Sequence, residues 1–341
     1  MSDPILPWHA AAVERLLARR EAMPHALLVL GREGIGKVEF ARGFGKALLC
    51  EAGGSRACGQ CAACRWFDEG NHPDYRELFP DAQAEDSAAD GEPAGEAPGE
   101  KKSREIRIEQ VRDLSDFMTL STHRDGFRVL VVHPAEAMNS AAANAFLKTL
   151  EEPPPRTVIV MVAERAGRLL ATIRSRCQRL VLPAPEAREA ETWLAAAGIA
   201  DAATLLAQAG GAPLLALQMA SAEQQEARRR FLATLAEREP DLLACAQGFE
   251  KAELVQLVGW MQCWVADLVT TRMAGSARFN PDRQEALQAI ARRLDPLRLL
   301  SFEAGLRRMR RHATHPLNAR LFVEQLLISY FQAITAQAAH R

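Results

Sequence analysis

Residues 26–37 read ALLVLGREGIGK and join an apolar run to a glycine-rich loop. Ala26 to Leu30 have the length and composition of a buried strand, and Gly31 to Lys37 fill every position of the pattern G-x-x-x-x-G-K. Phe40 and Phe44 follow at helical spacing. A strand, a glycine loop and a helix in this order are the context in which backbone N–H groups cradle phosphate. The segment therefore predicts a parallel α/β domain of the P-loop type.

Apolar runs of strand length recur at 129–132, 158–162 and 180–182. Continuous runs of this kind are typical of parallel strands that are covered on both faces. A helix is predicted over 139–152, because three consecutive prolines follow it and cannot continue a helix. Strands and helices therefore alternate, which predicts that residues 1–183 form one α/β domain.

Only helical patterns follow residue 183. Residues 184–224 predict a small helical domain, and residues 225–341 predict a larger all-α domain. One apolar stripe in the larger domain has the three- and four-residue spacing of a buried helix face: Leu254, Val258, Met261, Val265 and Leu268. The expected fold class is therefore α/β plus all-α.

Residues 81–100 differ in composition from the rest of the chain. They contain seven Asp or Glu, no Lys or Arg, and otherwise only Ala, Gly, Pro, Ser and Gln. Such a segment buries too little apolar surface to fold, so we expect a disordered acidic loop inserted in the first domain.

The overall composition excludes several classes of protein. Of the 341 residues 48% are apolar, which is enough for a core in each domain. Lys and Arg number 42 against 43 Asp and Glu, so no global positive charge marks an autonomous nucleic-acid binder. The sequence contains neither an apolar run of about 18 residues nor a basic, apolar leader, so we expect a cytoplasmic protein without a membrane span.

Four of the seven cysteines lie close together and form the pattern C-x7-C-x2-C-x2-C: Cys50, Cys58, Cys61 and Cys64. Thiolates at this spacing can converge on one tetrahedral ion, and we predict a structural Zn²⁺ that folds residues 50–64. Two alternatives stay open: three of the cysteines with His72, and an iron–sulfur cluster.

The phosphate loop lacks the partners that hydrolysis needs. Val38 follows Lys37 where the pattern requires a hydroxyl that binds Mg²⁺. The strand at 129–132 ends in His133 and Pro134 rather than in an acidic pair, and Glu136 is expected to be a solvated residue at a helix start. We therefore expect a degenerate loop at Gly31, Gly36 and Lys37 that does not hydrolyse ATP.

Several blocks of sequence together resemble the subunits of the bacterial DNA polymerase III clamp loader, most closely the delta prime type. They are the cysteine cluster, the His72 to Tyr75 block, residues 143–154 (ANAFLKTLEEPP) and residues 169–177 (LLATIRSRC). The resemblance implies an AAA+ architecture, in which the P-loop-type domain carries the zinc-binding insert, the small domain is a helical lid and the last domain is a helical collar that oligomerises.

The resemblance also assigns roles to residues. The sensor position of the active family falls on Ala163 and Glu164, and the lid arginine falls on Leu214, so two further parts of an ATP site are missing. Ser175-Arg176-Cys177 resembles the motif whose arginine reaches the ATP site of a neighbouring subunit, with Ser175 and Cys177 as its motif neighbours.

The implied function is that of a non-hydrolysing subunit of a DNA-directed DNA polymerase holoenzyme, which helps to load the sliding clamp onto primed DNA. Its implied partners are the gamma/tau and delta subunits, the clamp, and primed DNA as part of the complex. The alternative is an active DNA-dependent ATPase subunit of the gamma/tau type, against which Val38, His133 and Pro134 argue. A free-standing zinc-dependent nucleic-acid binder conflicts with the net charge of −1.

Overall fold

A computed structural model describes residues 5–83, 103–119, 122, 126–315 and 317–335. The chain divides into two compact units, Met1–Pro185 and Glu186–Arg341. Each unit has its own hydrophobic core. Among the described residues, no helix is both long enough and apolar enough to cross a bilayer.

The N-terminal unit is built on a five-stranded parallel sheet with the strand order β2-β3-β4-β1-β5. The strands are β1 (Ala26–Leu30), β2 (Tyr75–Leu78), β3 (Arg128–Val132), β4 (Thr157–Ala163) and β5 (Gln178–Val181). Side chains of β3 and β4 are buried along their whole length, as continuous apolar runs predict. The sheet confirms the predicted P-loop-type α/β fold of the AAA+ class.

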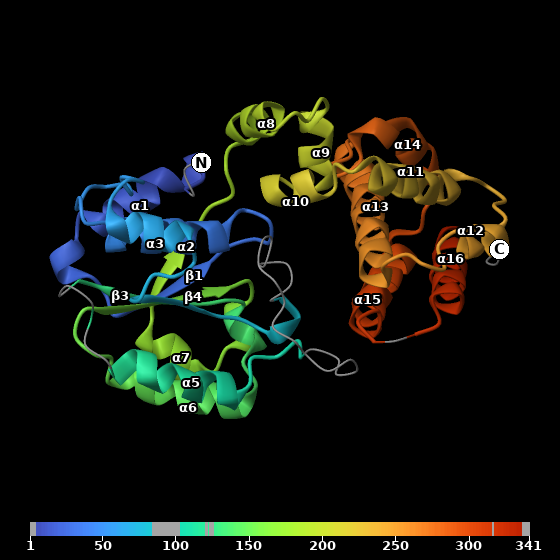
Figure 1. Ribbon diagram of the computed structural model, residues 1–341. Helices are drawn as coiled ribbons and strands as arrows, with labels where there is room; N and C mark the ends of the chain where they lie inside the picture. Colours follow the sequence, from blue (N-terminus) through green and yellow to red (C-terminus); the bar gives the residue numbers. More distant parts are fainter. Residues whose placement is uncertain (1–4, 84–102, 120–121, 123–125, 316, 336–341) are drawn as a thin grey trace. The chain divides into compact units, whose positions relative to one another are not determined.

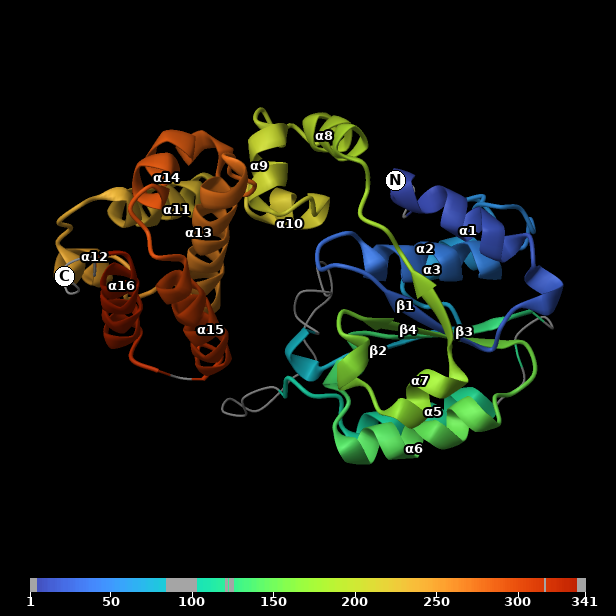
Figure 2. The ribbon, with the colours of Figure 1, turned by 180° about the vertical axis from the view of Figure 1, so that it is seen from behind.

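Helices cover both faces of this sheet (Figures 1 and 2). One layer contains α1 (Ala10–Leu17), α2 (Lys37–Leu49) and α3 (Ala62–Asp68). The opposite layer contains α5 (Ile108–Thr119), α6 (Ser140–Glu151) and α7 (Ala171–Arg176). Short 3-10 turns complete the unit: η1 (Pro7–His9), η2 (Arg20–Ala22), η3 (Asp81–Gln83), η5 (Ala135–Ala137) and η6 (Ala166–Arg168).

Both edges of the sheet differ from the sequence prediction. The edge strand β2 has no continuous apolar run and was not predicted. The other edge strand, β5, covers Gln178–Val181 instead of 180–182, because its pairing with β1 begins at Gln178 and Leu27. Of the predicted acidic loop, only Asp81–Gln83 belong to the described residues, and they form the turn η3.

The C-terminal unit is entirely helical in its described part. Three short helices form one apolar cluster: α8 (Ala187–Ala196), α9 (Ala202–Gln208) and α10 (Pro213–Gln218). The remaining helices are α11 (Ala222–Ala236), α12 (Leu242–Gln247), α13 (Leu254–Ala274), α14 (Gln284–Ala291), α15 (Pro296–His312) and α16 (Ala319–Thr335), with the 3-10 turn η7 (Pro281–Arg283) before α14.

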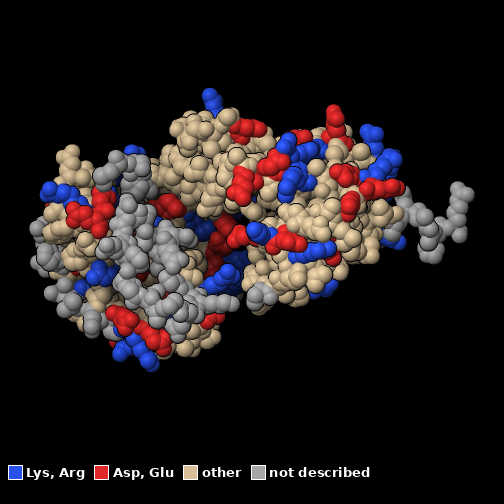
Figure 3. Space-filling model, turned by 45° about the vertical axis from the view of Figure 1, so that its right-hand side comes forward, with Lys and Arg blue, Asp and Glu red and all other residues tan. Residues whose placement is uncertain are grey.

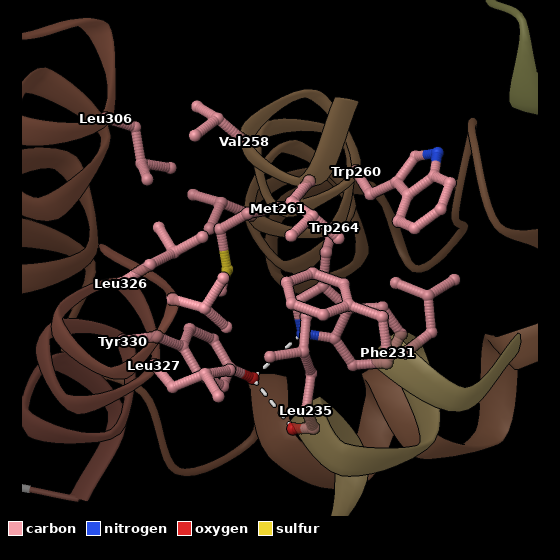
Figure 4. Packing of buried hydrophobic residues seen from close by; sticks show 14 of the residues in the cluster. Phe231, Leu235, Val258, Trp260, Met261, Trp264, Leu306, Leu326, Leu327 and Tyr330 are labelled. Atoms are coloured by element: carbon pink, nitrogen blue, oxygen red, sulfur yellow. Dashed lines mark hydrogen bonds between the residues drawn. The ribbon is translucent and has the colours of Figure 1, made fainter. Parts of the chain in front are cut away.

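The core of these later helices surrounds α13 (Figure 4). The predicted stripe from Leu254 to Leu268 is buried, as the helical spacing requires. Two aromatic residues also satisfy their polar atoms inside this core. The indole nitrogen of Trp264 donates to the Tyr330 hydroxyl at 2.8 Å, and that hydroxyl donates to the Leu235 carbonyl at 3.0 Å (Figure 4).

Candidate functional site

The phosphate loop lies between β1 and α2, as predicted, and its glycines are required by close contacts. Gly36 has a φ of +88°, and a Cβ atom there would collide with Cδ1 of Leu6. A Cβ atom on Gly31 would lie 2.9 Å from the Leu182 carbonyl oxygen. The backbone of a P-loop is therefore present.

The lysine of this loop contacts its own chain. Lys37 is 7% exposed, and its ammonium group donates to the Arg32 carbonyl at 2.6 Å. Burial lowers the pKa of Lys37, while the carboxylates of Glu164, Glu33 and Glu136 act in the opposite direction. Carboxylates therefore outnumber this one cation in its surroundings, and they disfavour a phosphate anion there.

The segment before α1 packs against the same loop. The indole nitrogen of Trp8 donates to the Ile35 carbonyl at 2.9 Å, and Nε2 of His9 lies 2.8 Å from that oxygen. His9 is fully buried, and burial lowers its pKa, which favours the neutral ring. Together with the Leu6 side chain next to Gly36, these residues tie the N-terminal segment to the phosphate loop.

The end of β3, where an active ATPase carries acidic residues, has a structural role. Nε2 of His133 lies 2.9 Å from a Glu77 oxygen, and Arg42 and the Tyr75 hydroxyl donate to the same carboxylate. Burial on its own raises the pKa of Glu77, but the hydrogen bonds from His133, Arg42 and Tyr75 outweigh it and lower that pKa to about 2. His133 thus connects β3 to β2.

Glu136 is not the solvated residue that the sequence predicted. It lies in η5, and its Oε1 atom accepts the backbone N–H groups of Glu164 at 3.0 Å and Arg165 at 3.3 Å. Its other carboxylate oxygen is buried. The side chain therefore holds the turn that follows β4, a role that depends on tertiary contact and that no local pattern indicates.

The four clustered cysteines converge, as their spacing predicted. Cys50 caps the C-terminal end of α2, and Cys61 caps the N-terminal end of α3. The four sulfur atoms lie within 4.8 Å of one another, and the Cys50–Cys61 and Cys58–Cys64 pairs are 4.0 Å apart. Tetrahedral zinc with bonds of about 2.3 Å needs sulfurs about 3.8 Å apart, so the cluster fits such an ion.

Backbone N–H groups donate to two of the clustered sulfur atoms. Cys50 accepts the N–H of Cys58 at 3.3 Å, and Cys61 accepts that of Cys64 at 3.4 Å. His72, the alternative ligand, is not part of the cluster, and its Nδ1 accepts the N–H of Asp74 at 3.1 Å. The geometry thus favours four sulfur ligands.

The three residues of the 175–177 motif have different surroundings. Arg176 is the last residue of α7, its side chain is 36% exposed, and its guanidinium lies 2.6 Å from Glu151 and donates to the Thr172 carbonyl. Ser175 donates to the same carbonyl at 3.0 Å. Cys177 packs against Met161, and burial raises its pKa to about 11. Within the motif, only Arg176 presents a charged group to solvent.

Arg176 and the phosphate loop lie at opposite ends of the parallel strands. The loop follows the carboxyl end of β1, whereas Arg176 precedes the amino end of β5. These two strands are parallel neighbours, with Leu27 paired to Gln178 and Leu30 to Val181. The arginine is therefore remote from the phosphate loop of its own chain.

The fold and the site together define a P-loop-type AAA+ protein with an all-helical C-terminal unit. Two family models match: "DNA polymerase III, delta subunit" over residues 10–186, and "DNA polymerase III, delta subunit, C terminal" over residues 222–331. The chain belongs to this family of DNA polymerase III subunits.

Curated relatives that match along almost their whole length are delta prime subunits, so the chain belongs to the delta prime family. The chain is 31% identical to DNA polymerase III subunit delta' of Pseudomonas aeruginosa, with 97% of this chain and 98% of that protein covered. It is 27% identical to subunit delta' of Escherichia coli, with 94% of each covered. Subunit tau of Bacillus subtilis is 30% identical, but over only 46% of this chain and 24% of that protein. The gamma/tau alternative is therefore not favoured.

Proposed function

We propose that this chain acts as the delta prime subunit of a clamp loader, a complex that places the sliding clamp on primed DNA during replication in the cytoplasm. The gamma/tau and delta subunits are its proposed partners, and it meets the clamp and DNA as part of that complex. We also propose that residues 1–183, 184–224 and 225–341 serve as P-loop-type domain, lid and oligomerising collar. Family membership over nearly the whole chain supports this assignment.

Within the complex, we propose that Arg176 acts as an arginine finger for a neighbouring subunit. The observation that carries this proposal is its position at the amino end of β5, whereas the phosphate loop of its own chain follows the carboxyl end of the parallel neighbour β1. A partly exposed guanidinium at the end of a short helix can reach a partner, and its planar donor set stabilises the charge that develops on a transferred phosphoryl group.

The chain itself is proposed not to hydrolyse ATP. Val38 offers no oxygen ligand for Mg²⁺, and His133 is engaged by Glu77. Lys37 donates to Arg32, and the N-terminal segment packs on Gly36. These contacts disfavour ATP binding at the loop, in addition to the absence of the residues that bind Mg²⁺.

The ion in the cysteine cluster is proposed to be a structural Zn²⁺. Four sulfur ligands with mutual distances near 4 Å suit closed tetrahedral coordination, which leaves no open position for a substrate. Cys50, Cys58, Cys61 and Cys64 would hold the ion and fix the loop between α2 and α3.

The direct test of the function is reconstitution of the loader with Arg176→Ala. We expect normal assembly but slower clamp loading, and we expect Arg176→Lys to be nearly as damaging, because an ammonium group lacks the bidentate fork. Arg179→Ala, an exposed arginine on β5, is the matched control and should load clamps normally. Normal loading by Arg176→Ala would refute the arginine-finger role, and failure of the unmodified chain to assemble with gamma/tau and delta would refute the subunit assignment.

A further inference from the structure

A pocket of about 360 Å³ lies within the C-terminal unit, between α9, α11 and η7. This volume is at the lower end of the range for small-molecule sites. Most of the side chains that line it are charged or amide-bearing, and they include Gln208, Glu226, Arg228, Arg229, Asp282 and Arg283. Ala222, the first residue of α11, also borders the pocket, and the helix dipole there favours negative charge.

Arg228 is the buried cation of this pocket. It is 4% exposed, and its Nη2 atom donates to the Asn280 side chain at 2.5 Å. Its Nε atom is buried and has no hydrogen-bond partner among the described residues, and none of the ion pairs formed by those residues includes Arg228. Burial lowers the pKa of Arg228, and Asp282 partly offsets this effect. A buried guanidinium without an ion-pair partner would be stabilised by a bound anion.

The buried carboxylate of Asp267, which contacts Asn280, already accepts several hydrogen bonds. Asp267 is fully buried and accepts the backbone N–H groups of Arg278, Phe279 and Asn280, as well as the side-chain amide of Asn280. Asn280 therefore links Asp267 to Arg228 and positions the guanidinium without neutralising it directly.

The acidic residues at the pocket are also paired. Glu226 binds Arg229 on the same helix, and Asp282 lies 3.3 Å from Nε of Arg283. Both pairs join residues that are close in sequence, and each includes an exposed carboxylate. On the face of the molecule seen in Figure 3, Lys and Arg intermingle with Asp and Glu. Arg228 thus remains the one positive charge lining the pocket that lacks an acidic partner within the described chain.

Gln208 adds a second buried polar group from a different helix. It is 8% exposed, and its Oε1 atom is buried without a hydrogen-bond partner among the described residues. An amide oxygen only accepts, so this atom can pair with a hydroxyl of a ligand, such as the P–OH group of hydrogenphosphate. A ligand that contacts Gln208 and Arg228 would join α9 to α11.

We propose that this pocket binds a small phosphate-type oxyanion, held by the guanidinium of Arg228 and the amide of Gln208. Guanidinium groups recognise tetrahedral oxyanions through charge-assisted hydrogen bonds. Inorganic phosphate occupies only part of the volume, and pyrophosphate fits the same chemistry with more of the pocket filled. Bound there, the anion would brace the helices of the proposed lid against those of the proposed collar.

The test uses the full chain and two probes, inorganic phosphate and pyrophosphate. Binding is measured by calorimetry and by the shift in thermal unfolding midpoint relative to chloride at equal ionic strength. Arg228→Met and Gln208→Leu should each weaken binding about tenfold or more, which is the loss expected for one charge-assisted or one buried hydrogen bond. Arg230→Met, an exposed arginine on α11 outside the pocket, should bind both probes like the unmodified chain.

Gln208→Leu keeps the test decisive even if Arg228→Met does not fold. Absence of binding by the unmodified chain would overturn the proposal. Equal binding by the unmodified chain and Gln208→Leu, or a loss that follows Arg229→Ala but not Arg228→Met, would indicate ion pairing at the exposed rim and would also overturn it.

Discussion

The phosphate loop and the Ser175–Cys177 motif lie in the same unit but differ in how their charged groups are used. In the loop, the pattern of residues is complete, yet Lys37 is buried against Arg32 and surrounded by carboxylates. In the motif, the residues form only a short helix end, yet Arg176 is partly exposed. Binding chemistry therefore depends on which polar groups remain accessible, rather than on how well a sequence pattern is filled.

If the chain does not hydrolyse ATP, as we propose, this contrast explains why its P-loop-type architecture is kept. Gly31, Gly36 and the loop backbone are still required, because they allow the close packing of Leu6, Ile35 and Leu182. Arg176 serves no packing role of that kind, since its contacts are one surface ion pair and one helix carbonyl. We propose that the loop persists for stability and that the arginine persists for the partner.

The largest expected effect concerns the cysteine cluster. This cluster lies at the far end of α2, which starts at Lys37 in the phosphate loop and is capped by Cys50. Cys61→Ser should lose the bound metal and lower the unfolding midpoint of the N-terminal unit by about 5 °C or more, since a structural metal contributes folding energy. Metal analysis and calorimetry of the pure protein measure both effects. Cys245→Ser, which lies outside the cluster, should change neither. Full metal content in Cys61→Ser would refute the four-cysteine site.

The next effect concerns Glu77, which binds Arg42 of the helix that follows the phosphate loop and is expected to stabilise the fold. Glu77→Gln should lower the free energy of unfolding by about 2 to 3 kcal/mol at neutral pH, because it removes the charge that His133, Arg42 and Tyr75 stabilise. Denaturant unfolding measures this loss, with the exposed Glu109→Gln as control.

The contribution of Glu77 to the free energy of unfolding should decrease at low pH. The folded-state pKa of Glu77, about 2, is below its ordinary value of 4.5, so its contribution is complete above about pH 4.5 and is lost as the pH falls towards 2. The stability difference between Glu77→Gln and the unmodified chain should therefore shrink over that range. A constant difference from neutral pH down to about pH 3 would contradict the assignment.

A smaller effect is expected from the ion pair that holds Arg176. Glu151→Gln removes the charge 2.6 Å from the guanidinium, and exposed pairs of this kind are worth less than about 1 kcal/mol. In the assembled loader we expect ATP turnover to rise by no more than about fivefold, because the arginine is released towards the partner. Glu152→Gln is the neighbouring control. A fall as deep as that of Arg176→Ala would show that Glu151 belongs to the arginine-finger machinery itself.

The smallest effect is expected at the loop. The isolated chain should not turn over ATP above background, and Lys37→Ala should leave that result unchanged, because Val38 and His133 supply no metal ligand. Phosphate release from the pure protein is the measurement. Turnover by the unmodified chain that disappears in Lys37→Ala would overturn the non-hydrolysing assignment.

Much of this architecture was predictable because its signals are local. The run 26–37, the prolines after α6 and the cysteine spacing each combine a residue type with a fixed spacing, and the structure places β1, α6 and the sulfur cluster accordingly. These features need no knowledge of distant contacts.

The missed features depend on residues that meet only in the folded chain. The strand Tyr75–Leu78 is short, lies at the sheet edge, and carries Glu77 for a network that includes His133, 56 residues away in sequence. Glu136 holds a turn 28 residues further along, and Glu151 meets Arg176 across two elements. No periodicity encodes such pairs, which explains why Glu136 was predicted to be solvated.

The proposed roles of Lys37 and Arg176 are separated by the ATP turnover of two loaders that differ only in this subunit, measured with clamp and primed DNA present. One carries Lys37→Ala and the other Arg176→Ala. An arginine finger is worth about 10³ to 10⁵ in rate at its own site, and the other sites of the complex should continue to work, so a partial loss is expected with Arg176→Ala. Turnover should be unchanged with Lys37→Ala. Loss with Lys37→Ala and normal turnover with Arg176→Ala would contradict both proposed roles.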